Sequence, residues 1–197
     1  MILCDTDIEK VQKVYNLLTP FVDGVQDGVI SYGLSSHGYD LRLGHKILVF
    51  KNSYNERVSP KRFKSDPNYA KRLFDEITVE KDGDVFIAPP HSYLLAYSLE
   101  YIRMPNHLAG QCVGKSTFAR CGLVVNTTPI ESAWEGHLTI EIANTSPCPV
   151  DMFAGEGMCQ MLLFMLSGIP RKTYKDKKGK YDRQGAEPIP ARVSGKE

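Results

Sequence analysis

The sequence predicts a mainly β protein with a short N-terminal helix, and two observations predict it. Short segments rich in β-branched and aromatic residues recur along most of the 197 residues. Glycine and proline turn signals separate these segments, and no regular helical spacers lie between them. The pattern is typical of a β-sandwich, jelly roll or small barrel, and it argues against a parallel α/β sheet.

Only the N-terminal segment has a helical pattern. Its apolar residues recur at helical spacing, at Ile8, Val11, Tyr15 and Leu18. Thr6 and Glu9 have the spacing of a capping box, and Pro20 stops the run. We therefore expect a helix that begins near Thr6 and ends before Pro20.

Ten later segments are expected to form strands. They are 29–31, 39–43, 46–50, 76–79, 85–88, 92–99, 108–113, 123–126, 137–144 and 160–166. Residues 51–75 contain two prolines and mixed charge, which predicts a long surface insertion with a helical turn around 69–74 and no evident role. No internal linker divides the chain, so we expect one domain over 1–197 with a flexible basic segment at about 171–197.

The charge balance excludes a dedicated binder of long nucleic acids. The chain has 24 Lys and Arg against 23 Asp and Glu, a formal net charge of +1. Residues 171–183 nevertheless hold seven cations and two acidic residues, a local charge of +5. Such a run is usually a solvated face, but its interleaved tyrosines and glycines also suit a loop that closes over a small polyanion.

Targeting and cysteine signals favour an intracellular protein. The N-terminus lacks the basic and then apolar order of a secretory signal, and the most apolar stretch, 161–166, is too short to span a bilayer. Five cysteines without close pairing do not predict a disulfide framework. We expect a cytoplasmic protein with reduced thiols and no membrane partner.

The segment from Gly110 to Thr117 approaches a phosphate-binding loop but does not match it, because Ala109 stands where the motif needs its first glycine. What remains is a short helix that Ser116 would cap and Gly122 would close. Lys115 and Arg120 beside the start of this helix could form an anion site. The alternative is a surface turn with two solvated cations.

Glu141 is a candidate proton carrier. Residues 135–143 alternate with a two-residue period, which places Leu138, Ile140 and Ile142 on the core face and Thr139 and Glu141 on the other. A carboxyl group in partly apolar surroundings suits proton transfer. A solvent-facing strand glutamate is the alternative.

Motifs of other enzyme classes are absent from the sequence. Zinc-dependent base deaminases carry H-x-E followed by P-C-x-x-C, and neither occurs here. The five histidines lack second ligands at metal-like spacing, and no G-x-S-x-G elbow is present. The sequence therefore predicts no protein-bound metal and no serine or cysteine nucleophile.

Four ordered blocks resemble the dCTP deaminases of the trimeric dUTPase-like superfamily. The blocks are 30–43 (ISYGLSSHGYDLRL), 114–122 (GKSTFARCG), 134–141 (WEGHLTIE) and 179–185 (GKYDRQG). The resemblance implies a distorted dUTPase-like β-barrel that forms a homotrimer with active sites between subunits. It also implies zinc-independent hydrolysis of dCTP to dUTP and ammonia, which supplies dUTP for dUMP and thymidylate synthesis, with Mg²⁺ bound through the substrate triphosphate. Because dTTP inhibits some relatives, the resemblance makes dTTP a candidate inhibitor of this protein.

The resemblance also assigns residues. Glu141 is similar to the family's catalytic glutamate, and Ser116 and Arg120 to the residues that hold the water and the base. The implied nucleotide contacts are Lys115, Ser116, Thr117, Phe118, Ala119, Arg120, Thr139, Ile140, Glu141, Gln160, Tyr174, Lys180 and Gln184. The basic segment would fold over the triphosphate at a neighbouring subunit's site.

One loop departs from some family members. Those members carry two more residues, including I-D-P-G, where this chain reads T-P-I-E-S-A at 128–133. Glu131 is the candidate replacement for the aspartate near the sugar. A bifunctional enzyme that also cleaves dUTP to dUMP and pyrophosphate is the nearest alternative, and a non-catalytic nucleotide-sensing trimer is another.

Overall fold

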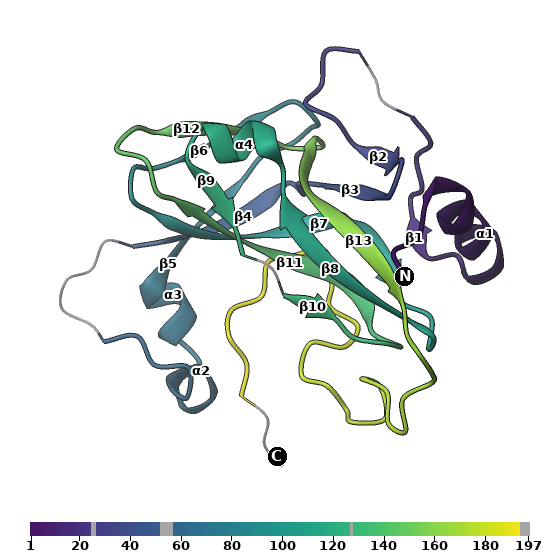
Figure 1. Cartoon of the computed structure of the whole chain (residues 1–197). Coiled ribbons are helices and arrows are strands. Elements are labelled where there is room, and N and C mark those ends of the chain that lie inside the picture. The colour runs from purple at the N-terminus through teal and green to yellow at the C-terminus, as the bar shows by residue number, and fades with distance from the viewer. Residues whose placement is uncertain (25–26, 52–56, 127, 194–197) are drawn as a thin grey trace.

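Two antiparallel sheets form the body of the protein (Figure 1). The computed structural model describes residues 1–24, 27–51, 57–126 and 128–193. The larger sheet has the order β5-β4-β7-β11-β9, with β1 also paired to β7. Its strands are β1 (Leu18–Thr19), β4 (Lys46–Phe50), β5 (Phe74–Thr78), β7 (Tyr93–Arg103), β9 (Leu123–Val125) and β11 (Glu135–Asn144).

The second sheet has the order β10-β8-β13-β3-β2. Its strands are β2 (Gly33–Ser35), β3 (Gly38–Arg42), β8 (Leu108–Gly114), β10 (Pro129–Ile130) and β13 (Gly157–Met165). A separate pair joins β6 (Val85–Ala88) to β12 (Val150–Phe153). The prediction of a mainly β fold with a short N-terminal helix is confirmed.

One apolar core fills the space between the sheets. Leu94 of β7 and Ile142 of β11 belong to the same buried cluster as Leu41 of β3 and Leu163 of β13. All four side chains are fully buried. Burying a side chain of this size stabilises the fold by about 1.5–3 kcal/mol. The core therefore fixes how β11 lies against the rest of the protein.

A buried ion pair crosses this core. The Arg42 Nε of β3 donates to Glu100 Oε1 of β7 at 2.7 Å, and the Arg42 backbone N–H donates to Glu100 Oε2 at 2.9 Å. Burial raises the pKa of Glu100, and the hydrogen bonds from Arg42 oppose that rise. The Tyr32 ring lies 5.1 Å from the Arg42 guanidinium. The pair ties β3 of one sheet to β7 of the other.

The N-terminal helix α1 (Asp5–Tyr15) is shorter than its pattern predicts. Cys4 is the N-cap and makes no side-chain cap bond, so the predicted Thr6 capping box is wrong. The helix ends because Asn16 adopts a left-handed conformation with φ 50°. Its backbone N–H donates to the Gln12 carbonyl. Leu18, which the pattern placed on the helix, is fully buried in β1.

Nine of the ten predicted strands are present, with ends that differ by a few residues. The segment 29–31 is not a strand, and β2 begins two residues after it. Ser31 has φ 149° and Gly33 has φ 88°, and the Ile30 N–H donates to the Glu156 carboxylate at 3.0 Å. The backbone there bends around a side-chain acceptor, which no alternation of residue types reveals.

The insertion at 51–75 is folded where the structure describes it. It contains α2 (Arg62–Ser65) and α3 (Tyr69–Leu73), which confirms the predicted helical turn, and 52–56 lie outside the described residues. Tyr69 is fully buried, donates its hydroxyl to the Arg57 carbonyl at 3.0 Å and accepts the Ser59 N–H at 2.9 Å. With Leu73 it packs against the outer face of the larger sheet in a second apolar cluster.

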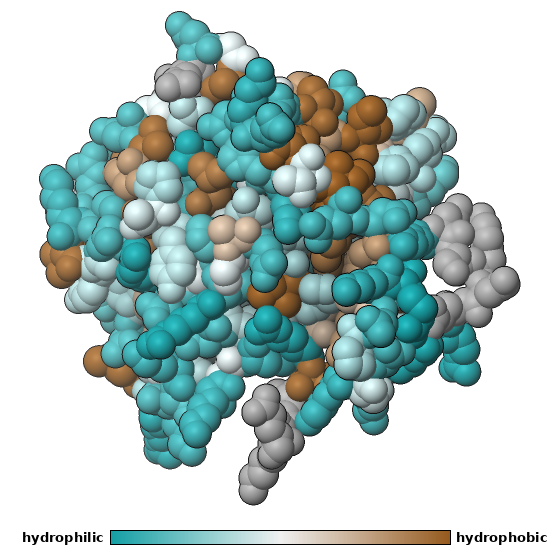
Figure 2. Space-filling view, turned by 180° about the vertical axis from the view of Figure 1, so that it is seen from behind, coloured by the Kyte–Doolittle hydropathy of each residue, from teal (hydrophilic) through white to brown (hydrophobic). Residues whose placement is uncertain are grey.

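The face seen from behind is mostly hydrophilic, with one larger apolar patch and several small ones (Figure 2). Large apolar side chains with substantial exposure include Val85 and Ile87 of β6. Exposure of this kind is normal for a folded chain. No helix within the described part of the chain is long and apolar enough to cross a membrane.

Candidate active site

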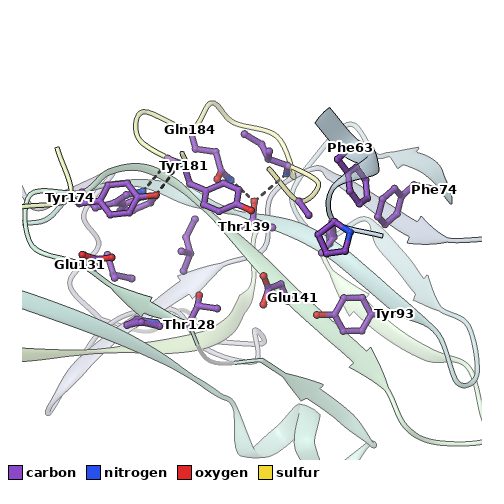
Figure 3. A pocket seen from close by; sticks show the side chains of 18 of the residues that line it. Phe63, Phe74, Tyr93, Thr128, Glu131, Thr139, Glu141, Tyr174, Tyr181 and Gln184 are labelled. Atoms are coloured by element: carbon purple, nitrogen blue, oxygen red, sulfur yellow. Dashed lines mark hydrogen bonds between the residues drawn. The ribbon is translucent and has the colours of Figure 1, made fainter. Parts of the chain in front are cut away.

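A cavity of about 370 Å³ opens beside β11 (Figure 3). Leu138, Thr139 and Glu141 of β11 line one side of it. The other sides come from three regions far apart in the sequence: the insertion with the adjoining residues of β4 and β7, the segment 128–134, and the C-terminal segment. Their lining residues are Phe50, Val58, Pro60, Phe63, Phe74, Tyr93, Leu95, Thr128, Pro129, Ile130, Glu131, Trp134, Tyr174, Tyr181, Gln184, Ile189 and Ala191.

A β-bulge shapes the strand that carries Glu141. His137 opposes Tyr101 and Thr139 opposes Tyr97, so residues 98–100 of β7 face the single residue Leu138. The Leu138 N–H donates to the Ser98 hydroxyl at 2.8 Å, and that hydroxyl donates to the Glu100 carbonyl at 2.8 Å. The buried Ser98 side chain thus replaces a backbone acceptor at the bulge.

The bulge also corrects one predicted orientation. Ile140 and Ile142 are buried in the core as the alternation predicts. Leu138 is only half-buried, and it lines the cavity as well as packing against the edge of the core. The predicted alternation between core-facing and outward-facing side chains therefore holds from Thr139 onward and fails at Leu138.

Removing the Ser98 hydroxyl is expected to destabilise the protein. Ser98→Ala leaves the partly buried Leu138 N–H without its acceptor, which costs about 1–3 kcal/mol of unfolding free energy. Urea unfolding measures this loss. Ser36→Ala, at an exposed position, is the matched control and should change stability by less than about 0.5 kcal/mol. Equal effects of the two substitutions would contradict the role of the hydroxyl.

Glu141 lies half-buried in the wall of the cavity. The Asn126 side-chain amide donates to Glu141 Oε2 at 2.8 Å. Figure 3 shows the Tyr93 hydroxyl directed toward Glu141. Burial raises the pKa of that hydroxyl, and the negative charge of Glu141 adds to the rise. A carboxylate beside a neutral phenol and an amide donor is placed to accept a proton from a molecule in the cavity.

The C-terminal segment packs over the same cavity. The Trp134 indole N–H donates to the Tyr181 carbonyl at 2.7 Å, and the Tyr181 N–H donates to the Tyr174 hydroxyl at 2.9 Å. Two of its cations form ion pairs with residues beside the cavity: Lys177 with Glu131 at 3.0 Å and Arg183 with Glu135 at 2.9 Å. Part of the local basic charge is therefore balanced within the chain.

Gln184 fastens this segment to β11. Its side-chain amide donates to the Thr139 hydroxyl, which also accepts the Ile189 N–H at 3.2 Å. The Gln184 backbone carbonyl accepts the His137 backbone N–H at 2.9 Å. Gly136 has φ 145°, and a Cβ at this position would lie 2.7 Å from the Gln184 backbone nitrogen. Only glycine permits so close an approach.

A second group of predicted site residues lies on the other sheet. The Lys115 Nζ, after β8, pairs with the buried Asp40 carboxylate at 2.5 Å and donates to the Ser31 hydroxyl at 2.8 Å. Gln160 of β13 donates to the Ser35 hydroxyl at 2.7 Å. Neither Lys115 nor Gln160 lines the cavity beside Glu141.

The short helix α4 (Ser116–Arg120) belongs to this second group. Phe118 is buried in the core, whereas Ser116, Thr117, Ala119 and Arg120 are exposed. Lys115 is the N-cap, so the prediction of Ser116 as the cap is wrong by one residue. Gly122 closes the helix as predicted, with φ 88° and its N–H on the Ala119 carbonyl at 3.1 Å.

The predicted site residues thus separate into two sets within one chain. The cavity brings together Glu131, Thr139, Glu141, Tyr174 and Gln184. The residues that lie outside it are Lys115, Ser116, Thr117, Phe118, Ala119, Arg120, Ile140, Gln160 and Lys180. The Ile140 side chain points into the core, and Lys180 is exposed with its ammonium 5.4 Å from the Tyr181 ring.

Sequence reasoning missed the aromatic wall of the cavity. Phe50, Phe63, Phe74 and Tyr93 come from the insertion and the strands beside it, and no periodic pattern marked them as neighbours of Glu141. Asn126 was missed too, although it is the last residue of the predicted strand 123–126, which ends near Glu141 in the sheet. Within the described ranges, no group of three or more His, Cys, Asp and Glu side chains is arranged to hold a metal ion.

Comparisons with known proteins identify the family. The family model described as dCTP deaminase-like matches residues 2–166. A dCTP deaminase of Chlamydia abortus is 45% identical over 94% of this chain and 96% of its own length. A dCTP deaminase of Herpetosiphon aurantiacus is 43% identical over 96% of this chain and 98% of its own length.

A solved structure supports the fold. The crystal structure of 2'-deoxycytidine 5'-triphosphate deaminase from Agrobacterium tumefaciens matches with a TM-score of 0.59 at 18% identity. The match covers 83% of this chain, and this chain spans about half (48%) of that longer one. The fold and the sequence blocks agree, and the chain belongs to the dCTP deaminase-like family.

Proposed function

We propose that the protein hydrolyses the exocyclic amine of dCTP to give dUTP and ammonia. The observation that carries this proposal is the placement of Glu141, with one carboxylate oxygen held by Asn126 and the side chain in the wall of a cavity. Relatives 43–45% identical over nearly the whole chain are named dCTP deaminases, which supports the substrate.

Glu141 would carry the protons of the reaction. Its carboxylate accepts a proton from water as the water oxygen bonds to C4 of cytosine, and it returns that proton to N3. A proton from the C4 hydroxyl group then reaches the amine through Glu141, the C4–N bond breaks, and ammonia leaves. Backbone groups of Thr139 and Ile140 lie on the same strand and would contact the base.

We further propose that the complete site forms between chains of a homotrimer. Lys115, Ser116 and Arg120 do not line the cavity of their own chain, and the exposed side of α4 is available to a neighbour. In this arrangement Ser116 and Arg120 would hold the water and the base at a neighbour's Glu141. Closed point-group symmetry would make all sites equivalent.

The triphosphate would meet two cations and a hydroxyl group in the same arrangement. Lys115 is the N-cap of α4, Thr117 supplies its hydroxyl from α4, and Lys180 comes from the C-terminal segment. That segment packs on the cavity of its own chain, so we place it over that cavity and not over a neighbour's. Mg²⁺ would arrive with the triphosphate as part of the substrate and offset its remaining charge.

Glu131, Gln160, Tyr174 and Gln184 would complete the nucleotide contacts. Glu131 lines the cavity in the shortened loop and pairs with Lys177, which supports its assignment as the carboxylate near the sugar. Tyr174 and Gln184 line the same cavity, whereas Gln160 belongs to the second set. Deoxyribose contact is therefore assigned to the Glu131 loop.

One assay separates this proposal from its alternatives. Purified protein is incubated with dCTP and Mg²⁺, and ammonia, dUTP, dUMP and pyrophosphate are followed together. Ammonia with accumulating dUTP is the expected result. Release of dUMP and pyrophosphate would indicate the bifunctional reaction, and dCTP binding without turnover would indicate a nucleotide-sensing trimer.

Zinc removal is expected to have no effect. A strong zinc chelator added with excess Mg²⁺ should leave the rate of ammonia release unchanged, because Glu141 and water suffice for the proposed proton transfers. Addition of Zn²⁺ to the chelated enzyme is the control. Loss of activity with the chelator and its recovery with Zn²⁺ would contradict the metal-independent mechanism.

A further inference from the structure

Asn126 makes two hydrogen bonds to one residue, Glu141. Its backbone N–H donates to the Glu141 carbonyl at 2.8 Å, extending the pairing of β9 with β11 by one residue. Its side-chain amide donates to Glu141 Oε2, also at 2.8 Å. The first bond fixes where the asparagine stands, and the second fixes one oxygen of the carboxylate.

The two bonds have separate consequences. The backbone bond does not depend on the side chain at 126, so it survives substitution. The side-chain bond is charge-assisted, which makes it stronger than a bond between neutral groups. It restricts the Glu141 rotamer and leaves Oε1 as the oxygen open to a water molecule. The side chain at 126 is exposed in the single chain, so it adds little to the core.

We propose that Asn126 is a positioning residue for the carboxylate of Glu141. The inference rests on the proposed function, because it concerns the proton carrier of that reaction. Asn126 acts through Glu141, and its amide N–H keeps Oε2 engaged so that Oε1 is aimed into the cavity. Tyr93, on the neighbouring strand, is a second polar group directed at this carboxylate.

Two substitutions at Asn126 distinguish a role as hydrogen-bond donor from a role in which only the shape of the side chain matters. Asn126→Ala removes the amide and should lower kcat for dCTP by about 10- to 100-fold, the range for losing a hydrogen bond to a charged group. Asn126→Asp keeps the shape of the side chain but replaces the donor with a second carboxylate, so it should lower kcat further. The KM should stay within about threefold, because Asn126 acts on Glu141 and not on the substrate.

Matched substitutions and a structural readout complete the test. Asn106→Ala and Asn106→Asp change an exposed asparagine elsewhere and should leave kcat unchanged. Crystal structures of the wild type and of Asn126→Ala should show Glu141 in one rotamer in the former and in several, or in a different one, in the latter. This readout does not require turnover, so it remains decisive if the wild type does not deaminate dCTP.

Three results would overturn the proposal. The first is an Asn126→Asp enzyme that is more active than Asn126→Ala. That result would mean that the shape of the side chain matters and its hydrogen-bond donor does not. The second is a raised KM with unchanged kcat, which would make Asn126 a substrate contact. The third is an unchanged Glu141 rotamer in Asn126→Ala.

Discussion

Glu141→Gln is expected to lower kcat for dCTP by about 10²- to 10⁴-fold, the range that general acid–base catalysis contributes. Glutamine keeps the shape and the hydrogen-bonding reach of the side chain, but it cannot accept a proton from water. The cavity wall and the bulge that positions this strand remain intact, so dCTP should still bind. Single-turnover kinetics and equilibrium binding of dCTP to the variant measure the two effects separately.

The control for this prediction is a carboxylate of the same cavity that carries no proton in the proposed mechanism. Glu131→Gln should mainly raise KM, because Glu131 is assigned to the sugar, and its kcat should exceed that of Glu141→Gln by at least about tenfold. Substantial turnover by Glu141→Gln, or equal losses of kcat in the two variants, would contradict the role of Glu141.

Arg120→Ala is expected to lower kcat by about 10²- to 10³-fold although Arg120 does not line the cavity of its own chain. The loss follows if α4 completes a neighbour's site and the guanidinium orients the water or the base there. Arg120 is exposed, and the buried Phe118 anchors α4, so the fold should be unaffected. Steady-state kinetics with a thermal unfolding curve separates the two effects.

Lys13→Ala, an exposed cation on α1, is the matched control for Arg120→Ala. It should change neither kcat nor thermal stability measurably. Wild-type turnover by Arg120→Ala would remove α4 from the active site and would leave its exposed face without a catalytic role.

The strands that depend on local pattern were predictable from the sequence. The segments 46–50 and 85–88 match β4 and β6 because both ends of each strand are bounded by turn residues in the chain itself. The bulge opposite Leu138 was not predictable, because it is set by how many residues of β7 stand across from one residue of β11. Pairing of this kind is a property of two strands, and the period of one strand does not contain it.

The candidate site was predictable in its residues but not in its grouping. Alternation marked Thr139 and Glu141 as neighbours on one face, and the cavity contains both. The pairing of Lys115 with Asp40 joins residues 75 positions apart, so no local spacing indicated that this cation has an acidic partner within its own chain. The insertion likewise lies at the cavity through contacts between distant residues, since Tyr69 and Leu73 pack with Leu48 and Leu95 of the sheet.

A mixed trimer tests most directly whether the site is shared between chains. Glu141→Gln and Arg120→Ala chains, each nearly inactive alone, are coexpressed with different tags, and the mixed species are purified and assayed for ammonia release from dCTP. Each mixed trimer should contain one intact site in three, since a site is intact only where an Arg120→Ala chain supplies Glu141 and a Glu141→Gln chain supplies Arg120. Activity near one third of the wild-type level is the predicted result. Activity no higher than that of the separate variants would contradict a site built from two chains.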